Sequence, residues 1–473
     1  MKAPLLLFAL ALAAVLRGEE SRAFRIVQVT DTHVIDEESP ARWIKFRKIQ
    51  FNGMTIDSSF RSWEDTSCQL LDAFNRTVNR RHRSGTPVSL LLHTGDMIDN
   101  DQGNELTWFA RIMKGGIVDP DSGADEDPLP GPGNDPNDPF TAQGLDPSIP
   151  WVGMPGNHDL EGQGNVLPSQ ADLFRQLALG MFAIPAAEGN FSRAMLVPRS
   201  PLLPPLTDAE VRRLPPGIVP ADAGRAWMER EGFVRTFLAE FGGQEAHGFS
   251  ACRVDEMDYS FRPRKDLPLR VIVLDTVNTY SGICEGVYDK RKVERFLKPE
   301  LDKALAQHEV VVLTSHHPPS NLADARILDI STGSIRVRPY QPGDWMTAAD
   351  CDQLLASYPN VVLWLAGHTH RNVVTPHARP QGEPWYEIET NSLFDFPQEA
   401  RSLTLNWKAP GTLGVALEMV AVDEGLSPLV DRAREMSRQA VAENPTLRFA
   451  AGQPGDRDGE LEIHYGFTLA GGE

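Results

Sequence analysis

Positive charge is scarce in this sequence. Its 473 residues include 46 lysines and arginines against 65 aspartates and glutamates, a formal net charge of −19. A field of that sign repels polyanions, so we expect no binding to duplex nucleic acid through a basic face. A phosphate ester would need a local source of positive charge, and bound metal cations are such a source.

Long hydrophobic runs are absent after the first twenty residues, so the sequence predicts no stable membrane span. Residues 1–20 differ, because Lys2 precedes an almost unbroken apolar run at 5–16 and polar residues follow it. This layout predicts a signal peptide, and therefore a secreted or periplasmic protein. An N-terminal anchor that is not cleaved is the alternative.

Cysteine is also rare, and the wide spacing of the four cysteines does not indicate a structural zinc site. In an exported protein they allow two disulfides in three connectivities; isolated thiols are the alternative. The four are Cys68, Cys252, Cys284 and Cys351.

Five short apolar segments are each followed by polar residues that can bind metal ions or transfer protons. The segments are 24–29, 88–92, 151–154, 310–313 and 361–365. Helical patterns at 67–82 and 289–307 lie between them. This alternation predicts a sheet covered by helices, with the polar residues gathered at the strand ends.

The motifs fall within residues 22–406, which we interpret as one catalytic domain with inserts at about 118–150 and 185–220. The first insert is rich in Asp, Pro and Gly, and the second in Pro; each predicts a long loop, either a functional lid or surface padding. Residues 407–473 carry a strand-like run at 413–422 and a helical pattern at 426–443, which predict an extension packed on the core.

Each polar cluster is weak evidence by itself, since an Asp at a strand end is often a helix cap and Asn-His after a glycine suits a turn. Together they supply the carboxylate, amide and imidazole groups that a pair of borderline metal ions requires. Seven of the twelve histidines fall in these clusters, at positions 33, 93, 158, 316, 317, 368 and 370.

The motifs and their order resemble those of the calcineurin-like metallophosphoesterase superfamily. They are Asp31-x-His33, Gly95-Asp96-x-x-Asp99, Gly156-Asn157-His158-Asp159, His316-x-Pro318 and Gly367-His368-x-His370. The resemblance implies an α/β fold, a four-layer αββα sandwich with two mixed β-sheets and a dinuclear metal site at the strand ends. It implies that one ion is held by Asp31, His33 and His370, the other by Asn157, His316 and His368, and both by Asp96.

The same resemblance implies the chemistry. Two divalent or trivalent ions, Mn, Fe or Zn, would hold a bridging hydroxide that attacks the phosphorus of a small phosphate ester. His158 would protonate the leaving oxygen, with Asp99 orienting it. A helix-capping Asp99, and Asp159 as the carboxylate partner of His158, are the alternatives.

Three other features are open. Family spacing selects His316 over His317, whose side chain we expect on the other side of the strand end, where it either lines the substrate pocket or satisfies a backbone group. His93 is either a support for the metal ligands or a plain strand-end histidine. The segment 391–398 either packs in the core or contacts substrate.

Details of the motifs narrow the function. Gly-Asn-His-Asp followed by His-His-Pro-Pro resembles the class III cyclic-nucleotide phosphodiesterases, which favours a phosphodiester substrate. Asp99 stands where purple acid phosphatases have Tyr, and Asn100-Asp101 where protein Ser/Thr phosphatases have Arg-Gly, so neither class is favoured. Fewer than seventy residues follow Asn406, too few for the substrate domain of 5′-nucleotidases.

We therefore expect an exported metal-dependent phosphoesterase that hydrolyses phosphodiesters. A phosphomonoesterase or nucleotidase of the same mechanism is one alternative. A non-catalytic metal-bound scaffold that uses its Pro-rich loops for interactions is the other.

Overall fold

The structure of the chain is a computed structural model. It describes residues 23–39, 49–51, 54–56, 61–123, 130–165, 175, 178–179, 221–278, 284–329, 336–408 and 411–465. The predicted signal peptide at 1–20 and the predicted insert at 185–220 lie outside these residues. Within them, no helix has both the length and the apolar character needed to cross a membrane.

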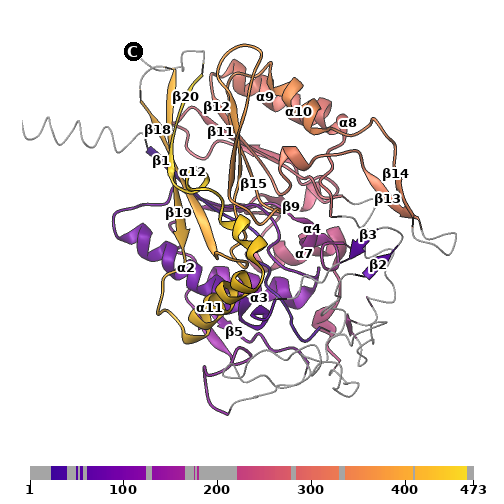
Figure 1. Cartoon of the computed structure of the whole chain (residues 1–473), viewed down its shortest axis with the longest axis vertical. Helices are drawn as coiled ribbons and strands as arrows, with labels where there is room; N and C mark the ends of the chain where they lie inside the picture. The colour runs from indigo at the N-terminus through magenta and orange to yellow at the C-terminus, as the bar shows by residue number, and fades with distance from the viewer. Residues whose placement is uncertain are drawn as a thin grey trace, which may run out of the picture.

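Two six-stranded sheets form the centre of the molecule (Figure 1). The first has the order β20 (Gly459–His464), β19 (Thr412–Ala421), β18 (Glu399–Trp407), β1 (Ala23–Val29), β4 (Leu90–His93) and β7 (Trp151–Gly153). The second has the order β10 (Tyr259–Phe261), β11 (Leu269–Leu274), β12 (Val310–Ser315), β15 (Val361–Ala366), β17 (Trp385–Glu389) and β16 (Val373–His377).

Both sheets are mixed. In the first, β1, β4 and β7 run parallel, while β18, β19 and β20 add antiparallel strands to the other side of β1. In the second, β11, β12, β15 and β17 run parallel between the antiparallel edge strands β10 and β16. The predicted fold class with two mixed sheets is confirmed.

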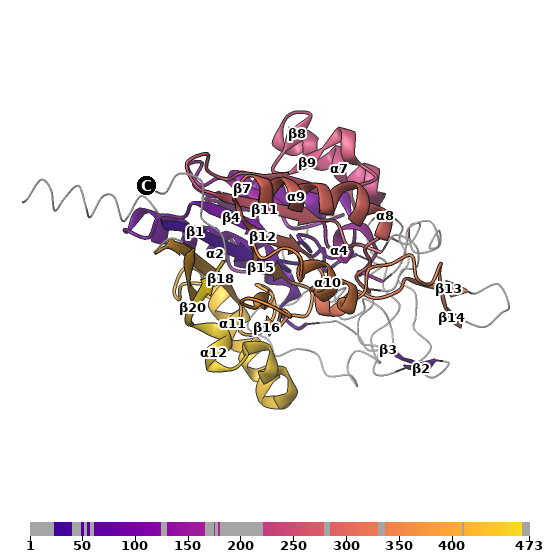
Figure 2. The same ribbon diagram turned by 90° about the horizontal axis from the view of Figure 1, so that it is seen from above.

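Helices cover the outer face of each sheet. The first sheet carries α2 (Ser67–Arg83), α3 (Gly103–Lys114), α7 (Glu229–Phe241) and α11 (Pro428–Glu443), whose apolar residues share one core with β1 and β4. The second carries α8 (Lys290–Lys292), a π-helical turn (Val293–Leu297), α9 (Lys298–Ala306) and α10 (Ala348–Leu355). Figure 2 shows α11 and α12 (Pro454–Arg457) on the side of the molecule opposite α7.

Short elements complete the described part. Four are two-stranded sheets: β2 (Ile49–Phe51) with β3 (Met54–Ile56), β5 (Gly116–Val118) with β6 (Phe140–Ala142), β8 (Glu245–Ala246) with β9 (Phe249–Ser250), and β13 (Arg326–Asp329) with β14 (Arg336–Pro339). The others are the helix α4 (Asn157–Leu160) and the 3-10 turns Glu64–Thr66, Ala223–Arg225, Ala251–Arg253, Pro319–Asn321 and Pro445–Ala451.

The alternation of side chains along the strands explains the layers. On β12, Val310 and Val312 face the first sheet, while Val311 and Leu313 pack under the helices of the second. Both faces are apolar because successive side chains of a strand point to opposite faces and each face is covered. The core between the sheets therefore fixes how the strand ends of the two sheets meet.

Two predicted peripheral segments are joined to this frame. Residues 407–473, predicted to pack on the core as an extension, supply β19 and β20 to the first sheet and the helix α11, which packs on α2. The insert at 118–150 is not loop throughout, because β6 pairs with β5 and Leu145 and Ile149 are buried in the core. All four cysteines are free thiols.

The core between the sheets gives a test of the fold. Leu363 on β15 is fully buried there, so Leu363→Ala should lower the free energy of unfolding by about 2–5 kcal/mol. Ile117→Ala, at a position 69% exposed, should change it by less than about 0.5 kcal/mol. Urea unfolding followed by tryptophan fluorescence measures both, and equal midpoints for the two variants would contradict the assigned core.

Candidate metal centre

The seven predicted ligands lie together at one edge of the sandwich, where strands of both sheets end. Parallel strands place their carboxyl ends on one edge, which is where such folds bind ligands. Asp31 and His33 follow β1, Asp96 follows β4, Asn157 begins α4 just after β7, His316 follows β12, and His368 and His370 follow β15.

One group consists of Asp31, His33 and His370. The Nε2 atom of His370 lies 3.1 Å from Oδ1 of Asp31 and 3.2 Å from Nε2 of His33. His33 Nε2 lies 3.8 Å from the same Asp31 oxygen. Two ligands of one tetrahedral ion at about 2.0–2.1 Å are about 3.3 Å apart, so these three atoms have the spacing of one coordination shell.

A second group consists of Asn157, His316 and His368. The Oδ1 atom of Asn157 lies 3.0 Å from His316 Nε2 and 3.1 Å from His368 Nδ1. The amide nitrogen of Asn157 donates to the carbonyl of Gly164 at 3.0 Å, which turns the amide oxygen toward the two imidazoles. This group also has the spacing of one ion's ligands.

Asp96 lies between the two groups. Its Oδ2 atom is 3.2 Å from His316 Nε2 and 3.9 Å from His33 Nε2, while its Oδ1 accepts a hydrogen bond from the backbone N–H of His158 at 2.9 Å. Oδ2 is buried, and the groups that face it are these two imidazole nitrogens. A carboxylate oxygen and imidazole nitrogens that converge in a buried site are suitable ligands for Mn, Fe or Zn. The residues present therefore fit two metal ions.

The backbone at these positions is unusual. Five of the seven have a positive φ, at 51° (Asp31), 40° (His33), 53° (Asp96), 68° (His368) and 53° (His370). Residues other than glycine rarely adopt this conformation, which costs about 1–3 kcal/mol each, and such residues cluster at functional sites. The left-handed residues end the strand geometry abruptly and turn the side chains into the common edge.

Two glycines allow the carboxylates to pack against backbone. A Cβ atom on Gly156 would collide with Oδ1 and the backbone nitrogen of Asp96, and one on Gly367 would collide with Thr30 and Asp31. At the second contact, Asp31 Oδ2 accepts from the N–H of His368 at 3.0 Å. Each aspartate therefore uses one oxygen for the backbone of a neighbouring motif and presents the other to the ligand group.

Carboxylates also contact two of these imidazoles at the ring nitrogen that points away from the ligand group. Asp99 Oδ1 lies 2.9 Å from His33 Nδ1, and Asp395 Oδ2 lies 2.5 Å from His370 Nδ1. His316 differs, because its Nδ1 pairs with the carbonyl oxygen of Thr94 at 2.8 Å. In each case the contact at Nδ1 fixes Nε2 as the nitrogen that faces the ligand group.

His158 lies beside the first group, with its ring centroid 4.6 Å from that of His33. Its Nδ1 is 2.9 Å from the carbonyl oxygen of Asp99 and 3.2 Å from the Asp99 carboxylate. Burial lowers the pKa of His158, but the carboxylates of Asp96 and Asp99 outweigh it and raise the pKa above its usual value. Asp99 thus touches two imidazoles, one from a predicted ligand and one from the predicted proton donor.

The structure decides between the alternatives for the carboxylate partner of His158. Asp159 accepts hydrogen bonds from the backbone of Met97, Ile98 and Gly156, so it organises the loops and does not face His158. Asp99 is not a helix cap, because α3 begins after Gln102.

His317 is not where strand alternation placed it. Its ring centroid lies 4.3 Å from that of His368 and 4.8 Å from that of His316, so it borders the cluster. The expectation fails because β12 ends at Ser315 and the alternation ends with it. His317 Nδ1 pairs with the hydroxyl of Thr276 at 3.0 Å.

His93 is a plain strand-end histidine. Its Nε2 pairs with the hydroxyl of Thr32 at 3.1 Å and its ring packs edge-on against Phe109. The segment 391–398 packs in the core through Leu393 and Phe394, which is one of the two alternatives expected for it, while Asp395 pairs with His370.

The sequence analysis did not predict the role of two residues, Arg61 and Asp395, although Asp395 belongs to the segment 391–398. Asp395 follows the last motif by 25 positions, and Arg61, which pairs with it, lies in no motif. The only signal was the placement of a charged residue between Phe394 and Phe396 close after the last ligand.

Asn372 ties the last motif to the C-terminal region. Its backbone N–H donates to the carbonyl of Ala450 at 2.9 Å, and its side chain donates to Glu399 at 2.9 Å. Its side-chain oxygen accepts from the backbone N–H of Asn391 at 3.0 Å. The loop that carries His368 and His370 is therefore held by residues about 80 positions further along the chain.

These features define a metal-binding α/β protein with carboxylate and imidazole ligands at the strand ends. The model of the calcineurin-like phosphoesterase family matches residues 24–192, a segment that contains β1, β4, β7 and four of the predicted ligands. The resemblance inferred from the motifs is confirmed.

Comparisons of whole structures give weaker likenesses. A dimetal phosphatase from Danio rerio is 13% identical with a TM-score of 0.39, covering 85% of this chain and 99% of that one. The sulfate thiohydrolase SoxB of Thermus thermophilus is 11% identical with a TM-score of 0.32, covering 89% of this chain and 61% of that one. A 5′-nucleotidase from Candida albicans is 11% identical with a TM-score of 0.32, covering 89% and 57%. No curated protein sequence matches the chain.

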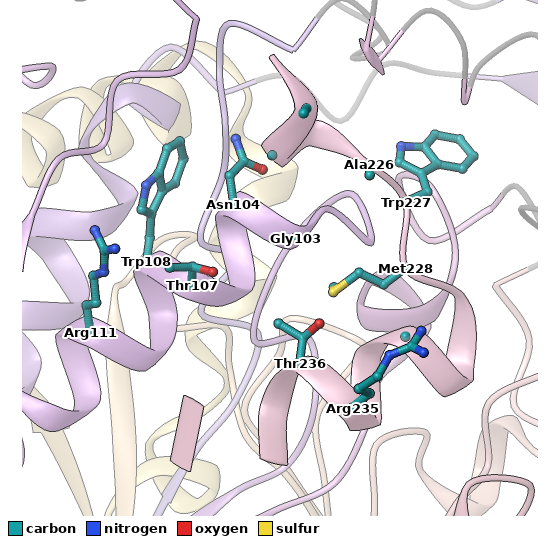
Figure 3. A pocket seen from close by; sticks show the side chains of 13 residues that line it. Gly103, Asn104, Thr107, Trp108, Arg111, Ala226, Trp227, Met228, Arg235 and Thr236 are labelled. Atoms are coloured by element: carbon teal, nitrogen blue, oxygen red, sulfur yellow. The ribbon is translucent and has the colours of Figure 1, made fainter. Parts of the chain in front are cut away.

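A separate cavity of about 560 Å³ lies between α3, the turn at 223–225 and α7 (Figure 3). Two arginines, Arg111 and Arg235, line it together with Trp108 and Trp227. None of the predicted site residues lines it, so this cavity is not part of the candidate centre.

The protonation states give a test of metal binding. Burial lowers the pKa of His316 and of His370, but neighbouring carboxylates, Asp96 and Asp31 respectively, outweigh it and raise the pKa values to about 9 and about 10. Near neutral pH both imidazoles of the metal-free protein are therefore protonated on both nitrogens and positively charged. A cation binds only the neutral imidazole, so binding should release these protons and the affinity should rise up to about pH 10.

Calorimetric titration with Mn²⁺ in two buffers of different ionisation enthalpy measures the protons released. Asp96 has its pKa lowered to about 2, because His316 and His158 outweigh its burial, and adds nothing to this release. An affinity that is flat between about pH 6 and pH 9 would contradict the assignment.

Proposed function

We propose that the chain is an exported, metal-dependent phosphoesterase that hydrolyses phosphodiesters. The observation that carries the proposal is the convergence of seven donor side chains into two groups that share Asp96. The family match supports hydrolysis of a phosphoester.

Each residue group has its own task in this proposal. Asp31, His33 and His370 would hold one ion, Asn157, His316 and His368 the other, and Asp96 both. When bound, the two cations would activate water as a nucleophile and neutralise charge on the phosphoryl oxygens.

His158 is the proposed acid for the leaving oxygen. Asp99 holds its Nδ1, so the free nitrogen Nε2 can donate a proton. The carboxylates of Asp96 and Asp99 raise the pKa of His158, which favours retention of that proton. Because Asp99 also contacts His33, the proton donor is fixed relative to the first ligand group.

The choice of a diester rests on sequence detail. Gly156-Asn157-His158-Asp159 and His316-His317-Pro318-Pro319 resemble the class III cyclic-nucleotide phosphodiesterases. Export rests on the apolar run at 5–16 that follows Lys2.

A substrate panel tests the reaction. With Mn²⁺ restored after chelation, we expect kcat/KM for bis(p-nitrophenyl) phosphate to exceed that for p-nitrophenyl phosphate, and cyclic nucleotides and dinucleotides should report natural diesters. Faster turnover of the monoester would make the chain a phosphatase or nucleotidase instead. If the protein binds two ions and hydrolyses neither ester, the scaffold alternative replaces the enzyme.

His158→Ala should lower kcat by about 10²–10⁴-fold for esters with a poor leaving group, because it removes the general acid. The loss should be smaller for p-nitrophenyl esters, whose leaving group needs less protonation. Metal content, measured by mass spectrometry, should not change. His464→Ala, at an exposed histidine, is the control, and equal losses on both ester types would argue against a proton-donor role.

A further inference from the structure

The carboxylate of Asp395 lies between a cation and an imidazole. Arg61 donates to it twice, from Nε to Oδ1 at 2.9 Å and from Nη2 to Oδ2 at 2.7 Å. On the other side, Oδ2 is 2.5 Å from Nδ1 of His370. The three side chains are only 13% to 22% exposed, so solvent competes little for these contacts. This is the bidentate geometry that gives an arginine–carboxylate pair a defined orientation.

Both ends of this chain of contacts are anchored. The backbone N–H of Asp395 donates to the hydroxyl of Ser392 at 3.1 Å, and the same hydroxyl donates to the carbonyl oxygen of Asp31 at 2.7 Å. The guanidinium of Arg61 lies 5.4 Å over the ring of Phe394, whose carbonyl accepts from the indole N–H of Trp63 at 3.0 Å. Asp395 is therefore fixed relative to Asp31, the neighbour of His370 in the first ligand group.

The two ligand groups are supported unequally. In the first group each imidazole has a carboxylate at its far nitrogen, Asp99 for His33 and Asp395 for His370. In the second group, the far nitrogen of His316 meets the neutral carbonyl of Thr94. A carboxylate behind a metal-binding histidine fixes the ring and makes it a stronger donor, and its loss costs about 10–100-fold in metal affinity.

We propose that the pair Arg61–Asp395 is a positioning element for the first metal site alone, acting through His370. This inference rests on the proposed function, since it requires that the two ligand groups hold ions. Arg61 holds the carboxylate, the carboxylate holds the Nδ1 edge of the imidazole, and Nε2 is thereby directed at Asp31 Oδ1, 3.1 Å away. Among the described residues, the structure shows no hydrogen bond or ion pair between this pair and Asn157, His316 or His368, so the second group keeps its ion when the pair is broken.

Metal affinity tests the proposal without reference to turnover. Full-length protein stripped with chelator is titrated with Mn²⁺, and bound ions per chain are counted by mass spectrometry. We expect Asp395→Ala to weaken one of two binding steps by about 10–100-fold and to leave the other unchanged. Asp423→Asn is the matched control, because Asp423 takes two hydrogen bonds from Arg80 in the same way, at 2.6 and 2.7 Å, on the exposed surface.

A double-variant cycle separates positioning from a general structural role. If Asp395 acts through His370, the variant with both Asp395→Ala and His370→Ala should bind Mn²⁺ no more weakly than His370→Ala alone. Additive losses would overturn the proposal, as would unchanged binding in Asp395→Ala.

A further variant covers failure to fold. If Asp395→Ala does not fold, Arg61→Gln is the alternative variant, because it keeps the Asp395 carboxylate and removes only the guanidinium that binds it. It should weaken the same Mn²⁺ binding step by a smaller factor. A wild-type chain that binds fewer than two ions would instead defeat the proposed function, a result distinct from any outcome of the variants.

Discussion

The buried carboxylate of Asp96 is the contact on which the site depends. One oxygen accepts from the backbone of the Asn157 motif, and the other faces imidazoles from both ligand groups. Because one acidic group serves two clusters, the loops after β4, β7 and β12 must converge within a few ångströms. The close fit of Gly156 against Asp96 shows how little room that convergence leaves.

The fold supplies the stability that this convergence requires. Left-handed backbone at five ligand positions and several buried charged groups are unfavourable in isolation. Two apolar cores bordering the first sheet and one under the helices of the second pack the strands from both faces, so the strand ends from which the loops start are held relative to one another. The strained residues thus follow directly on strands that are buried on both faces.

The sequence predicted the parts that repeat a simple pattern. Apolar strands that end in Asp, Asn and His are visible without a structure, and β1, β4, β7, β12 and β15 lie where these runs occur. What could not be predicted depends on contacts between distant segments. Arg61 lies in no motif. The role of Asp395 is visible only in the folded chain, where the loop after β17 lies beside the end of β1. The position of His317 was missed because the end of a strand, where alternation stops, is not marked in the sequence.

The hydrogen bonds of Asn372 to the C-terminal region have a consequence for the order in which the site forms. The Asp31 and His370 side chains that meet at 3.1 Å are separated by 339 residues, and the loop bearing His370 is fastened by the carbonyl of Ala450. Because the N-terminal residues leave the ribosome first, Asp31 and His33 emerge long before His370 and Ala450. The order of synthesis therefore places the fastening of the His370 loop after the emergence of the first two predicted ligands.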